Sequence, residues 1–173
     1  MKFLKRLIFL LIALVIIVSI IFVLNGKKLY EDVISQTSLV DTIQQIQNSK
    51  NYVKIEDLPK NYINAVIAVE DHRYKQHGAI DPIAICRAFW TNLTHFELRE
   101  GGSTITQQVA KNLFFITESD AATRKIAEIF AAIDLEKHYS KDTILELYVN
   151  TIYFGDGYYG IKEACKRILK YRA

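Results

Sequence analysis

Residues 101–108 read GGSTITQQ, and this segment carries the strongest signal in the 173-residue chain. Two glycines precede Thr104, and Gln107 follows it three residues later, which is the capping-box pattern at the start of a helix. The free amides of such a helix start, with the hydroxyls of Ser103 and Thr104, suit an anionic phosphate or a sugar. Lys111 lies one turn beyond Gln107 and would face the same ligand. By pattern alone, the segment is only a capped helix after a loop.

The sequence around this segment predicts a mainly α-helical domain. Seven glycines and two prolines are few helix breakers, and no stretch shows the period-two alternation of a strand. A helix that starts at Asp57-Leu58-Pro59 is expected to end near His77-Gly78. A second helix is expected to start after Asp81-Pro82, and a third to run from Thr104 through Leu113. A fourth is expected from about Ala121 to His138, with a core face of Ile126, Ile129, Phe130 and Ile133. The last two are expected from Lys141 to Asn150, with Ser140 as the cap, and from Ile161 to Lys170.

The first thirty residues predict a membrane anchor. Residues 7–24 are apolar except for Ser19, which is long enough for a helix that crosses the hydrocarbon core. Residues 22–25 lack the small side chains of a cleavage site, so a retained anchor is favoured over a cleaved signal peptide. Three basic residues precede this segment and two follow it, which favours a cytoplasmic N-terminus. We therefore expect a cytoplasmic tail (1–6), a single transmembrane helix (7–24), a stalk (25–51) and a domain outside the cytoplasmic membrane (52–173).

Composition argues against several classes of function. A formal net charge of +3 gives no support to bulk nucleic-acid binding, although it suits a protein beside anionic lipid. The four histidines form no HExxH, and Cys86 and Cys165 lack a CxxC spacing, so the sequence indicates no metal site. Each cysteine is expected to be a small core residue, with a disulfide left open.

Two further clusters suggest chemistry. Glu70 follows an apolar helical face, where a carboxylate can serve as a general base or acid, although a solvated helix end explains it as well. Arg124, Lys125 and Glu128 fall within about one helical turn. They are consistent with a surface pair of Arg124 and Glu128, or with a basic cluster for a pyrophosphate leaving group beside a second carboxylate. Spacing alone favours the structural interpretation of both clusters.

Taken together, these segments resemble the glycosyltransferase domain of monofunctional cell-wall transglycosylases and class A penicillin-binding proteins. The resemblance extends from about Leu58 to Ala164. It rests on Glu70-Asp71 with Tyr74, His77 and Ile80-Asp81-Pro82; on GGSTITQQ with Lys111-Asn112; on Arg124-Lys125 with Glu128 and Leu135-Glu136; on Ser140-Lys141 with Ile144-Leu145-Glu146, Tyr148 and Asn150; and on Tyr153-Phe154-Gly155 with Gly157 and Gly160-Ile161.

The resemblance implies a lysozyme-like helical fold and an inverting transfer. The 4-hydroxyl of one lipid-linked disaccharide (lipid II) would attack the anomeric carbon of the glycan on another, with loss of polyprenyl pyrophosphate. Glu70 matches the family's general base and Glu128 its second essential carboxylate. The residues that match the lining of the substrate cleft are Ser103, Thr104, Gln107, Lys111, Arg124 and Lys125. Phe89, Trp90, Leu93 and Phe96 are candidates for a hydrophobic region that dips into the bilayer, or equally for the core.

The implied partners are lipid II, the growing glycan strand, the cytoplasmic membrane and other cell-wall synthesis proteins, with no nucleic acid. No cofactor is required, although two carboxylates beside a pyrophosphate could hold a divalent cation such as Mg²⁺ or Mn²⁺ weakly. Two rival functions remain. An inactive homologue would bind lipid II or cell-wall synthesis proteins, whereas a lysozyme-like hydrolase would need no pyrophosphate site.

The sequence departs from the family pattern in three places. Ala79 stands where the family usually has glycine, and Asp120 stands where an arginine is common. The stretch around Asp120 is therefore acidic where phosphate binding would prefer positive charge. The chain stops at Ala173, before the helices that complete the domain in the family, so we expect its C-terminal part to be missing.

Overall fold

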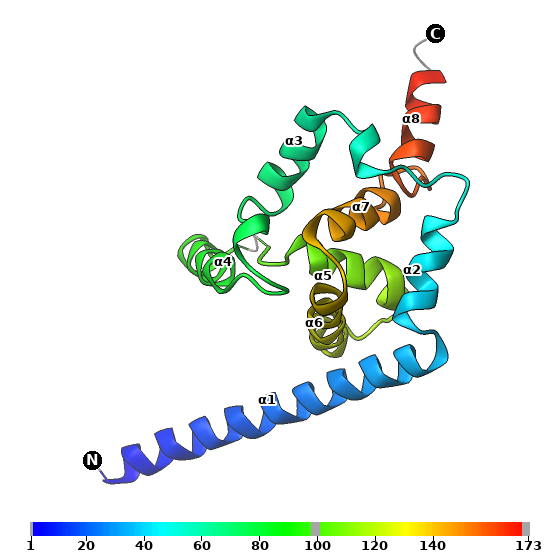
Figure 1. The fold of residues 1–173 in the computed structure, drawn as a ribbon. Coiled ribbons are helices and arrows are strands. Elements are labelled where there is room, and N and C mark those ends of the chain that lie inside the picture. The colour runs from blue at the N-terminus through cyan, green and yellow to red at the C-terminus, as the bar shows by residue number, and fades with distance from the viewer. Residues whose placement is uncertain (1, 98–100, 171–173) are drawn as a thin grey trace.

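The computed structural model describes residues 2–97 and 101–170. Over these residues the chain is helical and has no strand beyond one isolated bridge between Tyr153 and Tyr159, which confirms the mainly α-helical fold class. The helices in Figure 1 are α1 (Lys2–Gln36), α2 (Leu39–Gln47), α3 (Lys60–Glu70), α4 (Pro82–His95), α5 (Ile105–Ala110), α6 (Ala121–His138), α7 (Lys141–Thr151) and α8 (Ile161–Lys170), joined by short helical turns at Ile55–Asp57, Tyr74–Gln76 and Lys111–Phe115.

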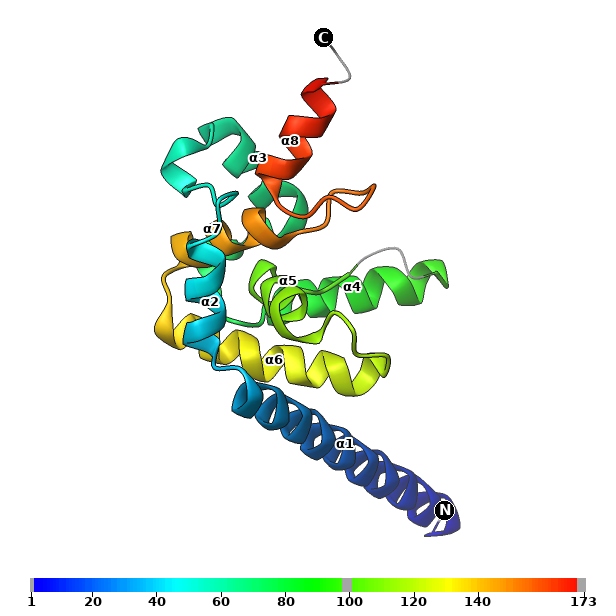
Figure 2. The same ribbon diagram turned by 90° about the vertical axis from the view of Figure 1, so that its right-hand side faces the viewer.

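The short helix α5 lies at the centre of the domain, between α6 and α7 (Figures 1 and 2). Five of its six residues are buried, Ile105 and Val109 completely. A helix of this length is not stable in water by itself, so its neighbours must hold it in place. Because α5 directly follows the GGSTITQQ glycines, its burial fixes the position of the candidate ligand-binding loop.

Small residues of α6 allow this close packing. Ala127, Ala131 and Ala132 are fully buried in the core. The expected core face of Ile126, Ile129, Phe130 and Ile133 is only partly correct: all four side chains are partly buried, and of them Ile133 packs against the core. The reason is a second neighbour on the other side of α6, the helix α1, which covers Ile126 and Phe130.

The long helix α1 combines a candidate membrane span with a docking segment. Among the described residues it is the one helix that is long and apolar enough to cross a membrane. Its C-terminal part runs along α6 (Figure 2), where Gly26 is buried against Ile126. The Tyr30 hydroxyl donates to Asp134 Oδ2 over 2.7 Å, and the Tyr30 ring stacks on Phe130. The segment expected as a stalk, 25–51, thus holds the end of α1 and all of α2, whose Leu39 and Ile43 are buried in the core.

The predicted caps of α5 and α7 are confirmed, and α4 begins next to its predicted start. Asp81 and Ser140 cap α4 and α7, and Thr104 and Gln107 form both halves of the predicted capping box. Asp120, which departs from the family pattern, accepts hydrogen bonds from the amides of Ala122 and Thr123 and caps α6.

One predicted helix end is wrong. The helix expected to reach His77-Gly78 ends at Glu70, because Asp71 has an extended backbone with φ of −160°. The Asp71 carboxylate is held outside the helix by His77 and by the backbone amide of Ile105. A tertiary contact thus ends α3 at the residue proposed as the base.

Two expectations of burial are also wrong. Cys86 and Cys165 are free and exposed, not core residues. Of the residues of α4, all of them described, only Ala88 is buried, and most of the others are exposed. The core interpretation of Phe89, Trp90, Leu93 and Phe96 is wrong for the same reason, since all four side chains are exposed. The sequence also predicts a turn at Glu100-Gly101-Gly102, and Glu100 lies outside the described residues.

Candidate active site

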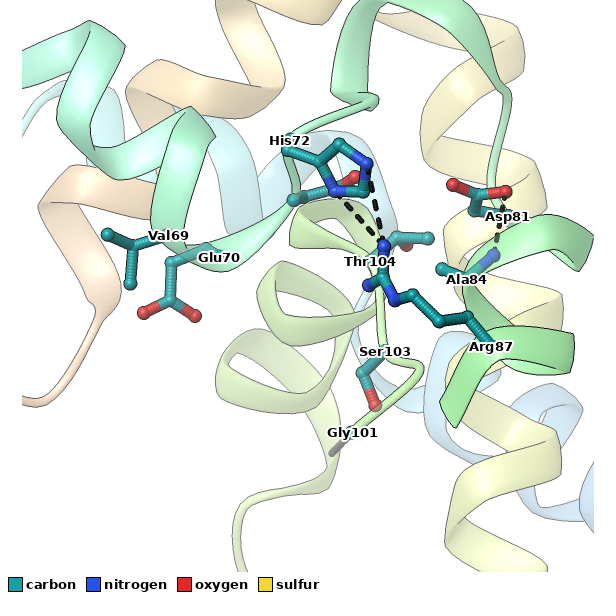
Figure 3. Close-up of a pocket in the computed structure, with 10 residues that line it drawn as sticks. Val69, Glu70, His72, Asp81, Ala84, Arg87, Gly101, Ser103 and Thr104 are labelled. Atoms are coloured by element: carbon teal, nitrogen blue, oxygen red, sulfur yellow. Dashed lines mark hydrogen bonds between the residues drawn. The ribbon is translucent and has the colours of Figure 1, made fainter. Parts of the chain in front are cut away.

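Two pockets, each of about 320 Å³, meet at Ser103. The first, here called the Glu70 pocket, lies between the end of α3, the start of α4 and the GGSTITQQ loop (Figure 3). The second, here called the Glu128 pocket, lies between α5 and α6, and its lining residues are Ser103, Gln107, Gln108, Lys111, Arg124, Lys125 and Glu128. Every site residue predicted from the sequence lines one of these two pockets.

Glu70 is the last residue of α3 and its side chain is exposed at the pocket wall. Gln108 Nε2, from α5, donates to Glu70 Oε2 over 3.0 Å. One carboxylate oxygen is therefore held by the protein, while the group as a whole remains accessible to a ligand. This arrangement suits a general base that must take a proton from a bound hydroxyl.

Glu128 is instead buried, with 3% of its surface exposed. Lys125 Nζ lies 2.8 Å from Glu128 Oε2, and Arg124 Nε lies 3.4 Å from Glu128 Oε1. A buried carboxylate needs such partners, because an unpaired charge away from water is strongly unfavourable. The interpretation of Arg124 and Glu128 as a surface pair is therefore wrong.

Lys125 connects the two pockets. Its Nζ donates to Ser103 Oγ over 2.8 Å as well as to Glu128, so one ammonium joins the glycine loop to α6. With the exposed Lys111 at the rim, the Glu128 pocket contains three positive side chains and one carboxylate. This excess of positive charge favours an anionic ligand.

Thr104 and Gln107 shape the loop from inside. The Thr104 hydroxyl donates to the carbonyl of Ala79 over 2.9 Å and accepts from the Gln107 amide over 3.2 Å. Gln107 Oε1 in turn accepts from the Thr104 amide. Both side chains are buried, so in the structure they hold the loop and the first turn of α5 in place.

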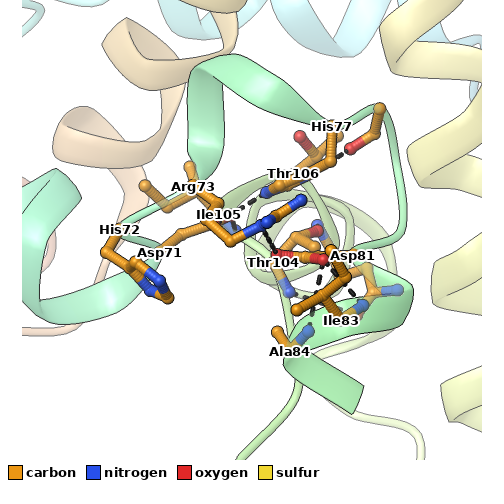
Figure 4. A network of polar contacts seen from close by, with 12 residues as sticks. Asp71, His72, Arg73, His77, Asp81, Ile83, Ala84, Thr104, Ile105 and Thr106 are labelled. Atoms are coloured by element: carbon orange, nitrogen blue, oxygen red, sulfur yellow. Dashed lines mark hydrogen bonds and ion pairs between the residues drawn. The ribbon is translucent and has the colours of Figure 1, made fainter. Parts of the chain in front are cut away.

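A buried network fastens the segment after Glu70 to α5 (Figure 4). His77 Nε2 lies 2.7 Å from Asp71 Oδ1, and Asp71 Oδ2 accepts from the Ile105 amide over 3.1 Å. Arg73 Nε donates to Asp81 Oδ2 over 3.0 Å. Asp71, His77 and Asp81 lie close enough to surround a metal ion, but each carboxylate already has protein partners. The network therefore serves to position the loop.

Within this network, the structure favours the charged form of the Asp81 carboxylate. Burial alone would raise the pKa of Asp81, but hydrogen bonds from the amides of Ala84 and Ile83 and the positive charge of Arg73 outweigh it and hold the pKa below its usual value. The charged form of Asp81 is thus part of the native fold.

Three site residues were not predicted from the sequence. Gln108 belongs to GGSTITQQ, so the helical register after Thr104 could have placed it beside Gln107 at the cleft. His72 and Arg87 line the Glu70 pocket, with Arg87 Nη1 3.5 Å from the ring nitrogens of His72 (Figure 3). Arg87 lies in none of the recognised motifs, so only the packing of α4 against the loop reveals it.

Comparison with known proteins identifies the family of the chain. Residues 36–172 match the family described as Transglycosylase. Penicillin-binding protein 1F of Bacillus subtilis is 40% identical over 162 residues, which are 88% of this chain and 22% of that protein. Penicillin-binding protein 1A of Aquifex aeolicus is 46% identical over 115 residues, 66% of this chain and 16% of that protein.

A monofunctional glycosyltransferase of Staphylococcus epidermidis is 40% identical over 131 residues, 76% of this chain and 48% of that protein. The chain thus spans about half the length, or less, of these curated relatives. The match to the family nevertheless covers all of the domain that carries the two pockets. The chain therefore belongs to the transglycosylase family of peptidoglycan glycosyltransferases.

Proposed function

We propose that this chain polymerises peptidoglycan glycan strands from lipid II. The observation that carries the proposal is the pair of pockets that meet at Ser103, one with an accessible carboxylate and one lined by three cations. Transfer of a glycan from a pyrophosphate needs both: a base for the incoming hydroxyl and positive charge for the departing phosphates.

Glu70 acts as the general base in this proposal. The sugar 4-hydroxyl of the acceptor loses its proton to the Glu70 carboxylate as its oxygen forms a bond to the anomeric carbon of the donor. Because Gln108 holds Oε2 over 3.0 Å, the lone pairs of Oε1 remain for this proton. The attack occurs opposite the leaving group, so the anomeric centre is inverted.

The Glu128 pocket stabilises the leaving group. The bond between the anomeric carbon and the pyrophosphate oxygen breaks, and its electron pair stays on the pyrophosphate. Lys111, Arg124 and Lys125 would meet this developing charge with charge-assisted hydrogen bonds. Glu128 holds Arg124 and Lys125 in position, since it is buried between them.

The residues present do not fit a tightly bound Mg²⁺ or Mn²⁺. Glu128 is already paired with two cations, and Asp71 and Asp81 are engaged by His77, Arg73 and backbone amides. We therefore assign the stabilisation of the pyrophosphate to the basic side chains.

The proposed location is the outer face of the cytoplasmic membrane. The N-terminal part of α1 would cross the bilayer with the N-terminus inside, because basic residues are more frequent before the apolar segment than after it. In both views of the fold, α4 and the N-terminal part of α1 project toward the same side of the domain (Figures 1 and 2). The exposed Phe89, Trp90 and Phe96 could then rest on the bilayer surface.

The test is a polymerisation assay with the full chain in detergent and fluorescent lipid II, with products sized on a gel. The parent should make polymer, Glu70→Gln should make none, and Glu128→Gln should be severely impaired. A folded parent that binds lipid II without making polymer would favour the inactive homologue. Release of soluble fragments from finished glycan would favour the hydrolase.

A further inference from the structure

The hydroxyl of Tyr148 is the most unusual polar group near the site. Tyr148 lies on α7 with 2% of its surface exposed, and its hydroxyl is buried with no hydrogen-bond partner among the described residues. Other tyrosine hydroxyls that contact α7 are satisfied: Tyr74 donates to the Lys141 carbonyl over 2.7 Å, and Tyr52 donates to Glu146. Since buried hydroxyls in native proteins are nearly always paired, the exception at Tyr148 requires an explanation.

The surroundings of Tyr148 offer one charged partner. Tyr148 and Glu70 line the same groove of about 270 Å³ between α3 and α7, here called the α3–α7 groove. Apart from the hydroxyl of Tyr62, the rest of this groove is apolar, with Ala65, Val66, Val69, Ile152 and Phe154. Val69 and Glu70 line both this groove and the Glu70 pocket, whereas Ser103 lines the Glu70 pocket and not the groove.

The hydroxyl and the carboxylate already interact electrostatically, although not at hydrogen-bond geometry. Burial and then the negative charge of Glu70 raise the pKa of Tyr148. Tyr148 therefore keeps its proton at working pH, and toward Glu70 it can act only as a donor. Hydrogen bonds at catalytic groups are often long in the absence of substrate and shorten when it binds.

We propose that Tyr148 is a positioning residue for Glu70, whose carboxylate it holds by donating a hydrogen bond in the working enzyme. Gln108 donates to the same carboxylate from α5. A carboxylate accepts about four hydrogen bonds, so both donors leave room for the substrate hydroxyl. The inference rests on the proposed role of Glu70 as the base, and it explains how a flexible side chain at an exposed helix end is kept in reach of its substrate.

The direct test is Tyr148→Phe in the full chain, which keeps the ring and removes the hydroxyl. We expect kcat to fall about tenfold or more, with little change in KM, because the base is misplaced while the substrate still binds. The acidic limb of the pH–rate profile should move to higher pH, since a donor that favours the charged carboxylate is lost. Tyr52→Phe is the matched control, because its hydroxyl contacts Glu146 on the same helix and it lines neither pocket. It should leave kcat and the profile unchanged.

A second test does not depend on activity. The midpoint of thermal unfolding is compared for the parent, Tyr148→Phe, Glu70→Ala and the double variant. If the two groups interact, the shift of the midpoint caused by Tyr148→Phe is less favourable in the parent than beside Glu70→Ala, where the hydroxyl has lost its partner.

Three results would overturn the proposal: equal shifts of the midpoint in both backgrounds, a coupled cycle with unchanged kcat, or an effect of Tyr52→Phe equal to that of Tyr148→Phe. A parent that makes no polymer would overturn the proposed function of the chain. The unfolding cycle would then still decide whether Tyr148 and Glu70 interact.

Discussion

Lys125 joins the glycine loop to the buried carboxylate of α6. Its ammonium lies 2.8 Å from Ser103 Oγ and 2.8 Å from Glu128 Oε2. It therefore neutralises part of the buried charge on α6 and also fixes the end of the glycine loop. A ligand phosphate that displaced Ser103 would find this ammonium already oriented, which is the form of preorganisation that stabilises developing charge most effectively.

The first residue-scale prediction concerns this contact. Lys125→Met leaves Glu128 buried with Arg124 alone, so we expect a loss of about 1–3 kcal/mol in the free energy of unfolding and loss of polymer synthesis. The double variant Lys125→Met/Glu128→Gln removes the unpaired charge and should be more stable than Lys125→Met. Denaturant unfolding followed by circular dichroism checks both. Purely additive losses would show that Glu128 does not depend on Lys125.

The second residue-scale prediction concerns acid stability. The pKa of Asp81 is held below its unfolded value of 3.8, so its contribution to stability is complete above that pH and is lost as pH falls through the lower folded pKa. Asp81→Asn keeps an oxygen for the amides of Ile83 and Ala84 but loses the pairing with Arg73. We expect it to be less stable than the parent at pH 6 and to lose less stability between pH 5 and pH 2. Thermal midpoints across this range measure the difference, and parallel pH curves would contradict it.

At the scale of elements, the joint between α1 and α6 connects the candidate membrane anchor to the helix that carries Glu128. A Cβ added at Gly26 would lie 2.4 Å from Ile126 Cβ and 3.1 Å from the carbonyl oxygen of Thr123. Thr123 directly precedes Arg124 and Lys125, so a shift of α6 at this joint would move the basic side chains of the pocket. The absence of a side chain at Gly26 thus allows the anchor to support the site.

This joint gives the element-scale prediction. The methyl group added by Gly26→Ala would clash with the Cβ of Ile126, so α1 and α6 must move apart. We therefore expect a loss of about 1–3 kcal/mol in the free energy of unfolding, and weaker polymer synthesis. Ile126→Gly removes the Cβ that the added methyl group would otherwise meet. In that background Gly26→Ala should have much less effect, as unfolding in detergent would measure. An equal loss in both backgrounds would place the cause in the membrane segment itself.

The elements also explain which features of the fold could be read from the sequence. Helix starts were predicted correctly at Asp81, Thr104 and Ser140, because a cap is a local interaction between residues a few positions apart. The end of α3 was not, because Asp71 leaves the helix for partners as distant as Ile105. The core face of α6 was assigned to its large apolar residues. Ile126 and Phe130 of that face pack on α1 instead. The sequence of α6 alone does not show which of its two apolar faces contacts the core and which contacts α1.

The same distinction applies to the site. All the site residues predicted from the motifs line one of the two pockets. The motifs did not show, however, that Glu70 is accessible and Glu128 buried, or that the Thr104 hydroxyl bonds to the Ala79 carbonyl. Burial depends on the assembled domain. For the same reason, the unpaired hydroxyl of Tyr148 became visible only when α3 and α7 were seen together.

At the scale of the whole molecule, the arrangement of α1 and α4 sets the relation of the site to the membrane. Both project toward one side of the domain, and α4 presents exposed apolar side chains there (Figures 1 and 2). The Glu70 pocket includes Ala84 and Arg87 of the same helix. A bilayer in contact with α4 would therefore lie near the cleft, as the proposed substrate, with its lipid tail and polar head, requires.

Trp90 makes this arrangement testable, because it is the one tryptophan in the chain and 67% of its surface is exposed in the structure. If α4 rests on the bilayer, Trp90 enters the interfacial region, where tryptophan is favoured. In vesicles its emission should then lie at shorter wavelength than in the unfolded chain, and brominated acyl chains should quench it more than acrylamide in the water does. Trp90→Phe combined with Lys137→Trp, at an exposed position in the last turn of α6, is the control, and its emission should respond mainly to acrylamide. Strong quenching of Trp90 by acrylamide alone would place α4 in water, and the exposed apolar face would then need a protein partner instead of a membrane.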